Sequence, residues 1–169
     1  MNEIAELFRR ITLGVYVVGA AHEGRLGAFT AVWVTQASYD PLLLAVSVNP
    51  RNATHVLMKA SGGFAVSVLK QGQLDLARRF GTPLESGQDK LAGVAWRSGY
   101  LGAPVLEEAL AHFECELMSC APAGDHELVI GRVIGGRILD TDAVPLTYAD
   151  TGSMDESSSL YAASFTDTR

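Results

Sequence analysis

The chain lacks the features that mark secreted, membrane-spanning and nucleic-acid-binding proteins. Only two of its 169 residues are cysteines, Cys115 and Cys120. A separation of five places them on opposite faces of a strand, where they cannot bridge each other, so we expect reduced thiols in a cytoplasmic protein. No apolar run approaches the roughly 18 residues of a membrane-spanning helix. The net charge of -6 and the lack of a Lys/Arg stripe argue against nucleic-acid binding.

Short catalytic and cofactor motifs are absent as well. There is no Gly-x-Gly-x-x-Gly after a predicted strand, no phosphate-binding Gly-x-x-x-x-Gly-Lys-[Ser/Thr] loop and no Gly-x-Ser-x-Gly elbow. A bound dinucleotide would therefore not be held by a Rossmann turn. The cysteines lack Cys-x-x-Cys spacing and the histidines lack His-Glu-x-x-His spacing, so we expect no metal site. The four histidines are His22, His55, His112 and His126.

The residues that are present recur with the periods of strands and short helices. Apolar residues make up 48% of the chain and charged residues 19%, as in globular proteins, and the length suits one domain. Ile4, Leu7, Phe8 and Ile11 predict an amphipathic helix over residues 1–11. Two more helices are expected, one over 71–80 and one capped by Asn52 or Thr54, with Val56, Leu57 and Ala60 on its apolar side. Strand patterns cover 13–20, 26–36, 42–48, 64–69, 111–120 and 127–139.

These segments predict a mainly β fold with short helices and an antiparallel sheet. Residues 22–25 form the turn of a hairpin between the first two strands. Closing the sheet into a barrel would remove its exposed edges. We expect one domain over residues 1–148 and a C-terminal extension over 149–169. In the strand 111–120, one face carries Phe113, Cys115 and Leu117 and the other carries His112, Glu114 and Glu116.

Two clusters of small and polar residues stand where binding chemistry is plausible. Residues 28–38 combine a strand with small and hydroxyl-bearing side chains, which lets a flat polar ring lie close to the main chain; an ordinary buried strand is the alternative. Residues 47–54 gather hydroxyls, amides and Arg51 where a strand meets a helix start. Helix N-termini favour anions and Arg can bind phosphate oxygens in a forked geometry, although capping by Asn52 or Thr54 explains the same residues.

Two pairs of neighbouring charged residues can each be interpreted either as ordinary surface residues or as ligand-binding residues. Asp125 and His126 follow Gly124 in a tight turn, where they are either ordinary exposed turn residues or place an imidazole beside a second ligand. Asp89 and Lys90 are either a solvated pair or place an ammonium group near a phosphate.

A series of short motifs follows in order along residues 11–148. They are Thr12-Leu13-Gly14-Val15-Tyr16-Val17-Val18, Ala31-Val32-Trp33-Val34-Thr35-Gln36-Ala37-Ser38, Asp40-Pro41, Phe64-Ala65-Val66-Ser67-Val68-Leu69, Phe80-Gly81, Asp89-Lys90-Leu91-Ala92-Gly93, Gly102-Ala103-Pro104-Val105-Leu106, Glu114-Cys115, Gly124-Asp125-His126, residues 131–133 and Pro145-Leu146. In order and spacing they resemble the flavin reductase-like family with the FMN-binding split barrel. That family includes reductase components of two-component flavin monooxygenases and flavin modules of rubredoxin and flavodiiron proteins.

The resemblance implies a homodimer with a flavin, FMN or else FAD, near the subunit interface. It places the nicotinamide near His126 and further flavin contacts at Phe80 and Gly81, and Lys90 is our added candidate for the phosphate. The ring and ribityl chain would be lined by Thr30, Ala31, Val32, Trp33, Val34, Gln36, Ala37 and Ser38. The phosphate side would be lined by Ser47, Val48, Asn49, Asn52, Ala53 and Thr54, with Arg51 as the cationic group.

The implied activity is hydride transfer from NADH or NADPH to the flavin, with electrons passed on to a monooxygenase or another acceptor protein. An FMN-binding module that passes electrons to a protein partner, with no reaction at nicotinamide, is the alternative. A barrel with a different ligand is a third. Two features depart from the family pattern. Val32 stands where the family often has Ser, and the chain continues past Thr151 to Arg169.

Overall fold

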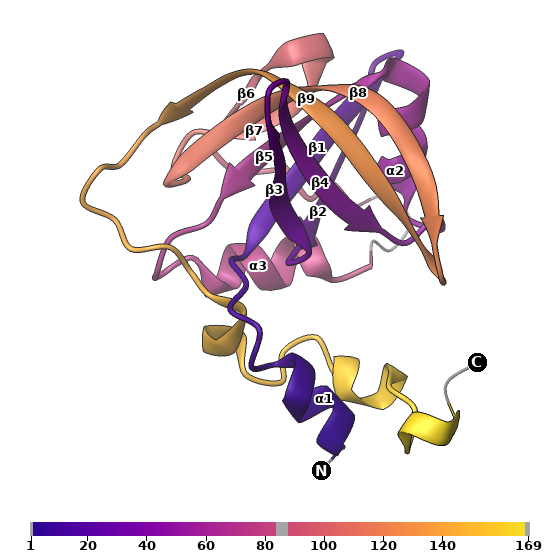
Figure 1. Cartoon of the computed structure of the whole chain (residues 1–169). Coiled ribbons are helices and arrows are strands. Elements are labelled where there is room, and N and C mark those ends of the chain that lie inside the picture. Colours follow the sequence, from indigo (N-terminus) through magenta and orange to yellow (C-terminus); the bar gives the residue numbers. More distant parts are fainter. Residues whose placement is uncertain (1, 84–87, 168–169) are drawn as a thin grey trace.

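The computed structural model describes residues 2–83 and 88–167, and in them seven antiparallel strands form one strongly curved sheet (Figure 1). The strand order is β2-β1-β5-β8-β9-β4-β3. The bounds are β1 Tyr16–His22, β2 Arg25–Ala31, β3 Val34–Tyr39, β4 Leu42–Val48, β5 Gly63–Val68, β8 Ala111–Ala123 and β9 His126–Ile138. Strands β6 (Trp96–Ser98) and β7 (Pro104–Leu106) pair with each other. The mainly β, antiparallel prediction is confirmed.

The predicted single strand over residues 26–36 is wrong. The chain leaves β2 at Ala31 and enters β3 at Val34, and these two strands lie at opposite ends of the sheet order. Val32 and Trp33 make the crossing, and the Trp33 carbonyl accepts a hydrogen bond from the Ser47 amide at 3.0 Å. The sheet therefore splits at the segment that the sequence marked for a flat ring.

Helix α2 (Ala53–Ser61) begins at the cap that the sequence predicted. Asn52 is the N-cap, with its side-chain oxygen accepting from the Thr54 amide, and Gly62 ends the helix with a left-handed φ of 78°. The predicted apolar face is mostly wrong, because of its three residues only Leu57 is buried, whereas Val56 and Ala60 are exposed. His55 and Met58 are buried instead. Helix α3 (Leu74–Gly81) begins three residues later than the helix expected over 71–80, and it buries Ala77 and Phe80.

Two large apolar clusters, and a small one of Ala65, Ala103 and Val105, make up the core of the described residues. The larger lies inside the sheet and includes Phe64, Val46 and Met58, whereas the second, around Phe80, Leu69 and Leu106, lies between the sheet and α3. Strand β8 places Phe113, Cys115 and Leu117 on the first cluster, which confirms their predicted common face.

The expectation that Cys115 and Cys120 point in opposite directions is wrong. Both contact the same core cluster, because β8 carries irregular register between Leu117 and Ser119, which reverses the alternation of faces. Both thiols are free, and burial raises the pKa of Cys115 to about 12.

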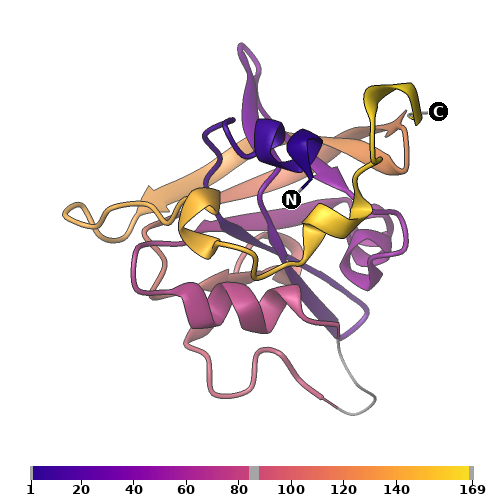
Figure 2. The same ribbon diagram turned by 90° about the horizontal axis from the view of Figure 1, so that it is seen from below.

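The N-terminal helix and the C-terminal 3₁₀ turns lie beneath the barrel in Figure 1, and the view from below in Figure 2 shows them next to each other. Helix α1 (Glu3–Phe8) is shorter than predicted, and Leu7, Phe8 and Ile11 are exposed rather than packed on the sheet. It contacts the C-terminal part instead: the Phe8 and Tyr161 rings are 5.5 Å apart, and the Asn2 side-chain amide donates to the Ala162 carbonyl at 3.0 Å. Within the described ranges, no helix is long and apolar enough to cross a membrane.

Candidate active site

A cavity of about 890 Å³ lies between β2, the N-terminus of α2 and the residues that follow α3. We call it the cradle cavity. It brings together nine residues that the sequence marked, from four separate segments. They are Thr30, Asn49, Arg51, Asn52, Ala53, Thr54, Phe80, Gly81 and Lys90.

The start of α2 gives one wall of the cradle cavity a positive character. The Asn49 side chain accepts from the Arg51 amide at 3.0 Å, and the Asn52 side chain accepts from the Thr54 amide at 2.9 Å, which fixes the turn into the helix. The first amides of a helix carry partial positive charge. The Arg51 side chain is exposed beside them and makes no ion pair with any residue in the described ranges.

Lys90 adds a second cation from the opposite wall. Its ammonium group donates to the Phe80 carbonyl at 2.8 Å, and partial burial lowers its pKa. Asp89 does not pair with it, because the Asp89 carboxylate accepts from the Leu91 amide at 2.9 Å. Arg25 lines the same space as a third basic residue. Basic side chains and a helix N-terminus around one cavity make a suitable site for a phosphate group.

Gly27 also lines the cavity, and no sequence motif marked it as a site residue. A Cβ atom at this position would lie 2.7 Å from the Thr54 hydroxyl and 2.9 Å from the Leu57 side chain. Only a residue without a side chain therefore lets β2 approach α2 this closely without displacement. The contact forms the floor of the cradle cavity.

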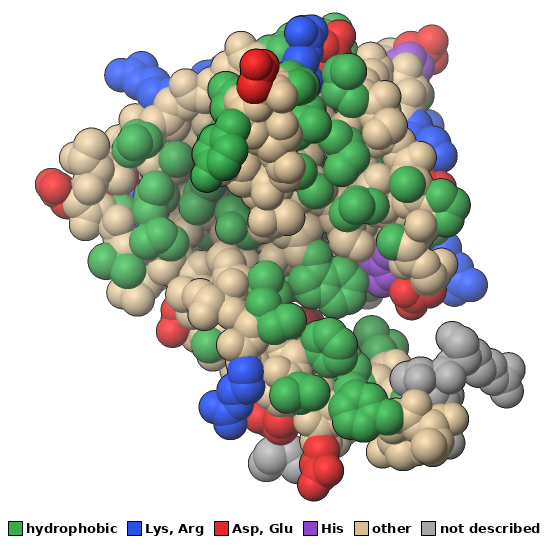
Figure 3. Space-filling view, in the orientation of Figure 1, with side chains coloured by type: hydrophobic (Ala, Val, Ile, Leu, Met, Phe, Trp, Pro, Cys, Tyr) green, Lys and Arg blue, Asp and Glu red, His purple; other side chains and the backbone are tan. Residues whose placement is uncertain are grey.

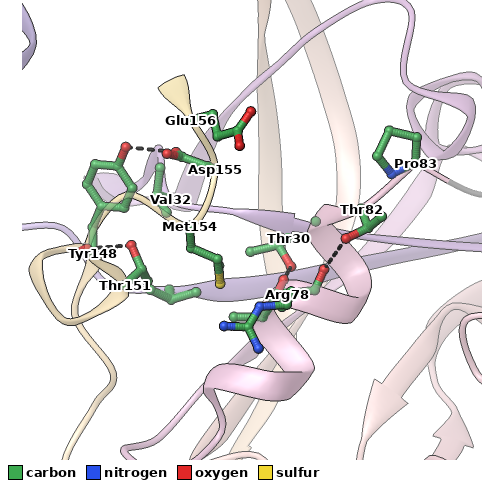
Figure 4. Close-up of a pocket in the computed structure, with 13 residues that line it drawn as sticks. Thr30, Val32, Arg78, Thr82, Pro83, Tyr148, Thr151, Met154, Asp155 and Glu156 are labelled. Carbon is green, nitrogen blue, oxygen red and sulfur yellow. Dashed lines mark hydrogen bonds between the residues drawn. The ribbon is translucent and has the colours of Figure 1, made fainter. Parts of the chain in front are cut away.

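A second cavity of about 480 Å³ adjoins the first, and we call it the tail cavity (Figure 4). Thr30, Gly81, Thr82 and Pro83 line both, so the two spaces meet at this point. Val32 lies on its barrel side. The opposite wall comes from the C-terminal part of the chain, which the sequence did not assign to a site: Tyr148, Thr151, Met154, Asp155 and Glu156.

The other predicted site residues line neither cavity. Ala31 and Val48 are buried in the core. Trp33 is 46% exposed, and its ring centroid lies 4.9 Å from that of His126 in an edge contact. Val34 and Ser47 are half-buried near the crossing. Ser38 is half-buried at the other end of β3, and Gln36 and Ala37 are exposed on that strand.

His126 begins β9 and is not a freely solvated turn residue. Its Nδ1 atom lies 2.8 Å from the Asp125 carboxylate, and this hydrogen bond lowers the pKa of Asp125. The bond and the Trp33 contact fix the imidazole on two sides. The ring is therefore oriented next to the residues that cross from β2 to β3.

The residues present fit a flavin mononucleotide moiety. The cradle cavity offers cations and helix amides for a phosphate. The adjoining tail cavity offers Thr30 on β2 and Val32 in the crossing, and the charged side chains of Arg78, Asp155 and Glu156 line it as well. Pockets of about 300–1,000 Å³ are typical for ligands of this size. Val32 carries no hydroxyl, so any hydrogen bond to a ring there would come from the main chain.

Comparisons with known proteins identify the family of the chain. The Flavin reductase like domain family matches residues 8–157. A ferric-chelate reductase (NAD(P)H) of Archaeoglobus fulgidus is 35% identical over 147 residues, which cover 86% of each chain. Diflavin flavoprotein A 1 of Synechocystis sp. is 31% identical over 144 residues, 85% of this chain but only 25% of its own length.

The fold has close counterparts among solved structures. The NADH:FAD oxidoreductase SgcE6 of Streptomyces globisporus, in complex with NAD and FAD fragments, has a TM-score of 0.79, 29% identity and coverage of 88% of each chain. The chain spans about a quarter of the length of the diflavin flavoproteins that it matches. The match to the family over residues 8–157 shows that the chain belongs to the flavin reductase-like family, whose fold is the split barrel.

Proposed function

We propose that this protein is an NAD(P)H-dependent flavin reductase that binds FMN or FAD. The observation that carries the proposal is the joining of two cavities at Thr30, one with phosphate-binding groups and one beside the strand crossing. Two relatives support it, the ferric-chelate reductase (NAD(P)H) of Archaeoglobus fulgidus and the NADH:FAD oxidoreductase SgcE6 of Streptomyces globisporus.

Each part of the site has a task that its chemistry allows. When bound, the flavin supplies the ring that accepts a hydride from a reduced nicotinamide. Arg51, Lys90 and the start of α2 bind the phosphate, while Thr30 and Val32 position the ring. His126, oriented by Trp33 and Asp125, holds the nicotinamide amide. Holding the two reactants in place supplies much of the rate, and no protein acid or base is required.

We also propose that the protein is a homodimer. Strands β3, β4 and β9 leave large apolar side chains exposed on one face, where Figure 3 shows hydrophobic groups across the front of the barrel. Tyr39 is 85% exposed and Ile138 is 63% exposed. Apolar patches of this kind are typical of protein interfaces, and a second copy would cover them. Size-exclusion chromatography with light scattering checks this, and a monomer at micromolar concentration would exclude it.

The test of the activity is direct. Purified protein is mixed with FMN or FAD and with NADH or NADPH, and loss of nicotinamide absorbance is followed in air. We expect flavin-dependent oxidation of at least one nicotinamide. A matched variant, Arg51→Ala, should oxidise it more slowly at limiting FMN and recover at saturating FMN. Absence of turnover with every pair of reactants would reject the proposal.

A second function is favoured by one specific relative. Because the chain matches a quarter of a diflavin flavoprotein, it can also be compared with a flavin module inside a larger electron-transfer protein. Such a module would hold flavin tightly and pass electrons to an acceptor protein such as a monooxygenase. Addition of NADH or NADPH to the flavin-loaded protein without oxygen separates the two. Bleaching of the flavin colour favours the reductase, and a stable yellow colour favours the module.

A further inference from the structure

The C-terminal segment, defined as residues 147–160, is folded back on itself by a local hydrogen-bond network. The Tyr148 hydroxyl donates to the Asp155 carboxylate at 2.8 Å and lies 2.9 Å from the Ser157 hydroxyl. At its start, Thr147 and Asp150 form a reciprocal cap. These contacts bring Met154 back over the barrel instead of letting the chain run into solvent.

The segment is also attached to the rest of the molecule on two sides. The Tyr148 amide donates to the Leu13 carbonyl at 2.8 Å, just before β1. From the other side, the Arg9 guanidinium donates to the Gly152 carbonyl and lies 5.4 Å from the Tyr148 ring centroid. The segment is therefore a fixed part of the same subunit.

Met154 occupies the position next to the strand crossing. It is half-buried and packs against the core cluster that also receives Val32. Figure 4 shows its side chain running from the C-terminal segment toward Thr30 and Arg78, into the tail cavity. The Asp155 and Glu156 side chains lie above it at the rim.

We propose that Met154, held by the Tyr148–Asp155 hydrogen bond, forms the outer wall of the flavin ring site and is a residue that determines flavin affinity through the ring alone. The inference rests on the proposed function. Met154 lines the same cavity as Thr30 and Val32, the residues proposed to position the flavin ring. Arg51 and Lys90, which are proposed to bind the phosphate, line the cradle cavity instead. A polarisable thioether packs well against an aromatic ring. The same surface keeps water from one side of the slot.

The proposal makes a prediction that separates ring contacts from phosphate contacts. Lumiflavin carries only the ring, riboflavin adds the ribityl chain and FMN adds the phosphate. A residue that touches only the ring changes the affinity for all three by the same factor. Methionine–aromatic contacts change affinity by up to about tenfold, so Met154→Ala should weaken the binding of each flavin by about three- to tenfold.

The experiment measures the Kd of the three flavins by quenching of their fluorescence. The variants are Met154→Ala, Met154→Trp, which fills the tail cavity, and Leu160→Ala as the control. Leu160 lies in the same segment but is 85% exposed and lines neither cavity. Met154→Trp should weaken all three flavins more than Met154→Ala does, and Leu160→Ala should leave them unchanged.

Two results would overturn the inference. One is wild-type affinity for all three flavins in Met154→Ala. The other is a loss confined to FMN, which would place Met154 at the phosphate. If Met154→Trp does not fold, Tyr148→Phe replaces it and should raise the rate of flavin dissociation. If the wild-type protein binds no flavin, the proposed function is rejected. If the wild-type protein binds flavin and the Met154 variants bind it equally well, only the role of Met154 is rejected.

Discussion

Replacement of Arg51 by alanine should weaken FMN binding without weakening riboflavin binding. Arg51 lines the cradle cavity at the start of α2 and makes no ion pair in the described part of the chain, so its charge is available to a ligand. Because riboflavin lacks only the phosphate, the ratio of the two dissociation constants isolates the interaction with that group. The ratio also cancels any general loosening of the site.

The size of the effect follows from exposure and charge. Two unit charges about 4 Å apart in water interact by about 1 kcal/mol, and a phosphate monoester carries about -1.5 to -2 charges at neutral pH. Because the Arg51 side chain is exposed, the interaction energy for charges in water applies, and not the larger energy for charges in a protein interior. The expected loss is about 2 kcal/mol, or roughly 30-fold in the Kd of FMN.

The assay is flavin fluorescence quenching at low and high salt. Screening at an ionic strength of about 1 M reduces the Debye length to about 3 Å, so the Arg51→Ala effect should shrink at high salt. Lys90→Ala should lower FMN affinity in the same way, and Arg10→Ala is the matched control, because Arg10 is exposed and lines neither cavity. An unchanged ratio of FMN to riboflavin affinity in both Arg51 and Lys90 variants would refute the phosphate assignment.

Three further outcomes can be measured. His126→Ala should raise the nicotinamide KM about tenfold with flavin affinity unchanged, because it removes one positioning contact worth about 1–1.5 kcal/mol; stopped-flow reduction at the wild-type rate and affinity would contradict this. Gly131→Ala should lower the free energy of unfolding by about 1–3 kcal/mol, since the new Cβ would lie 2.4 Å from the Phe64 ring, and thermal melting checks it. The Lys70 ammonium lies 2.8 Å from the Asp140 carboxylate and lowers the pKa of that carboxyl. The ion pair therefore stabilises the fold at pH values above the usual carboxyl pKa, and this stabilisation is lost as the pH falls through the lowered pKa. Lys70→Met should therefore lower the Tm at neutral pH, with the difference disappearing in acid, and a constant difference at every pH would speak against the pair.

Local patterns predicted most strands because their periods are set by residues close in sequence. Strand β4 falls at Leu42–Val48 as expected, and Asn52 caps α2 as its side chain chemistry suggests. The alternation of Phe113, Cys115 and Leu117 also holds, since one face of β8 must be buried. In each case the information lies within a few residues.

The errors lie where tertiary packing overrides the local pattern. Nothing in the run from Leu26 to Gln36 signals that the chain changes edges at Val32, because both halves have strand composition. The irregular register in β8 that turns Cys120 inward has no Gly to mark it. Val56 is exposed because α2 packs through Leu57 and Met58 onto β1 and β2, which a helix viewed in isolation does not reveal.

The site was predictable in part for the same physical reason. One short turn carries Arg51, Asn52 and Thr54, all of which can contact an anion, so their grouping can be seen in the sequence. Met154 and Tyr148 lie more than a hundred residues from Thr30, and only the return of the chain beneath the barrel brings them to the same cavity. The C-terminal segment thus lines the site although its sequence is polar and lacks an apolar pattern typical of a core element. Its polar groups can bond to each other, as Tyr148 does with Asp155, and so leave one apolar side chain free to line the site.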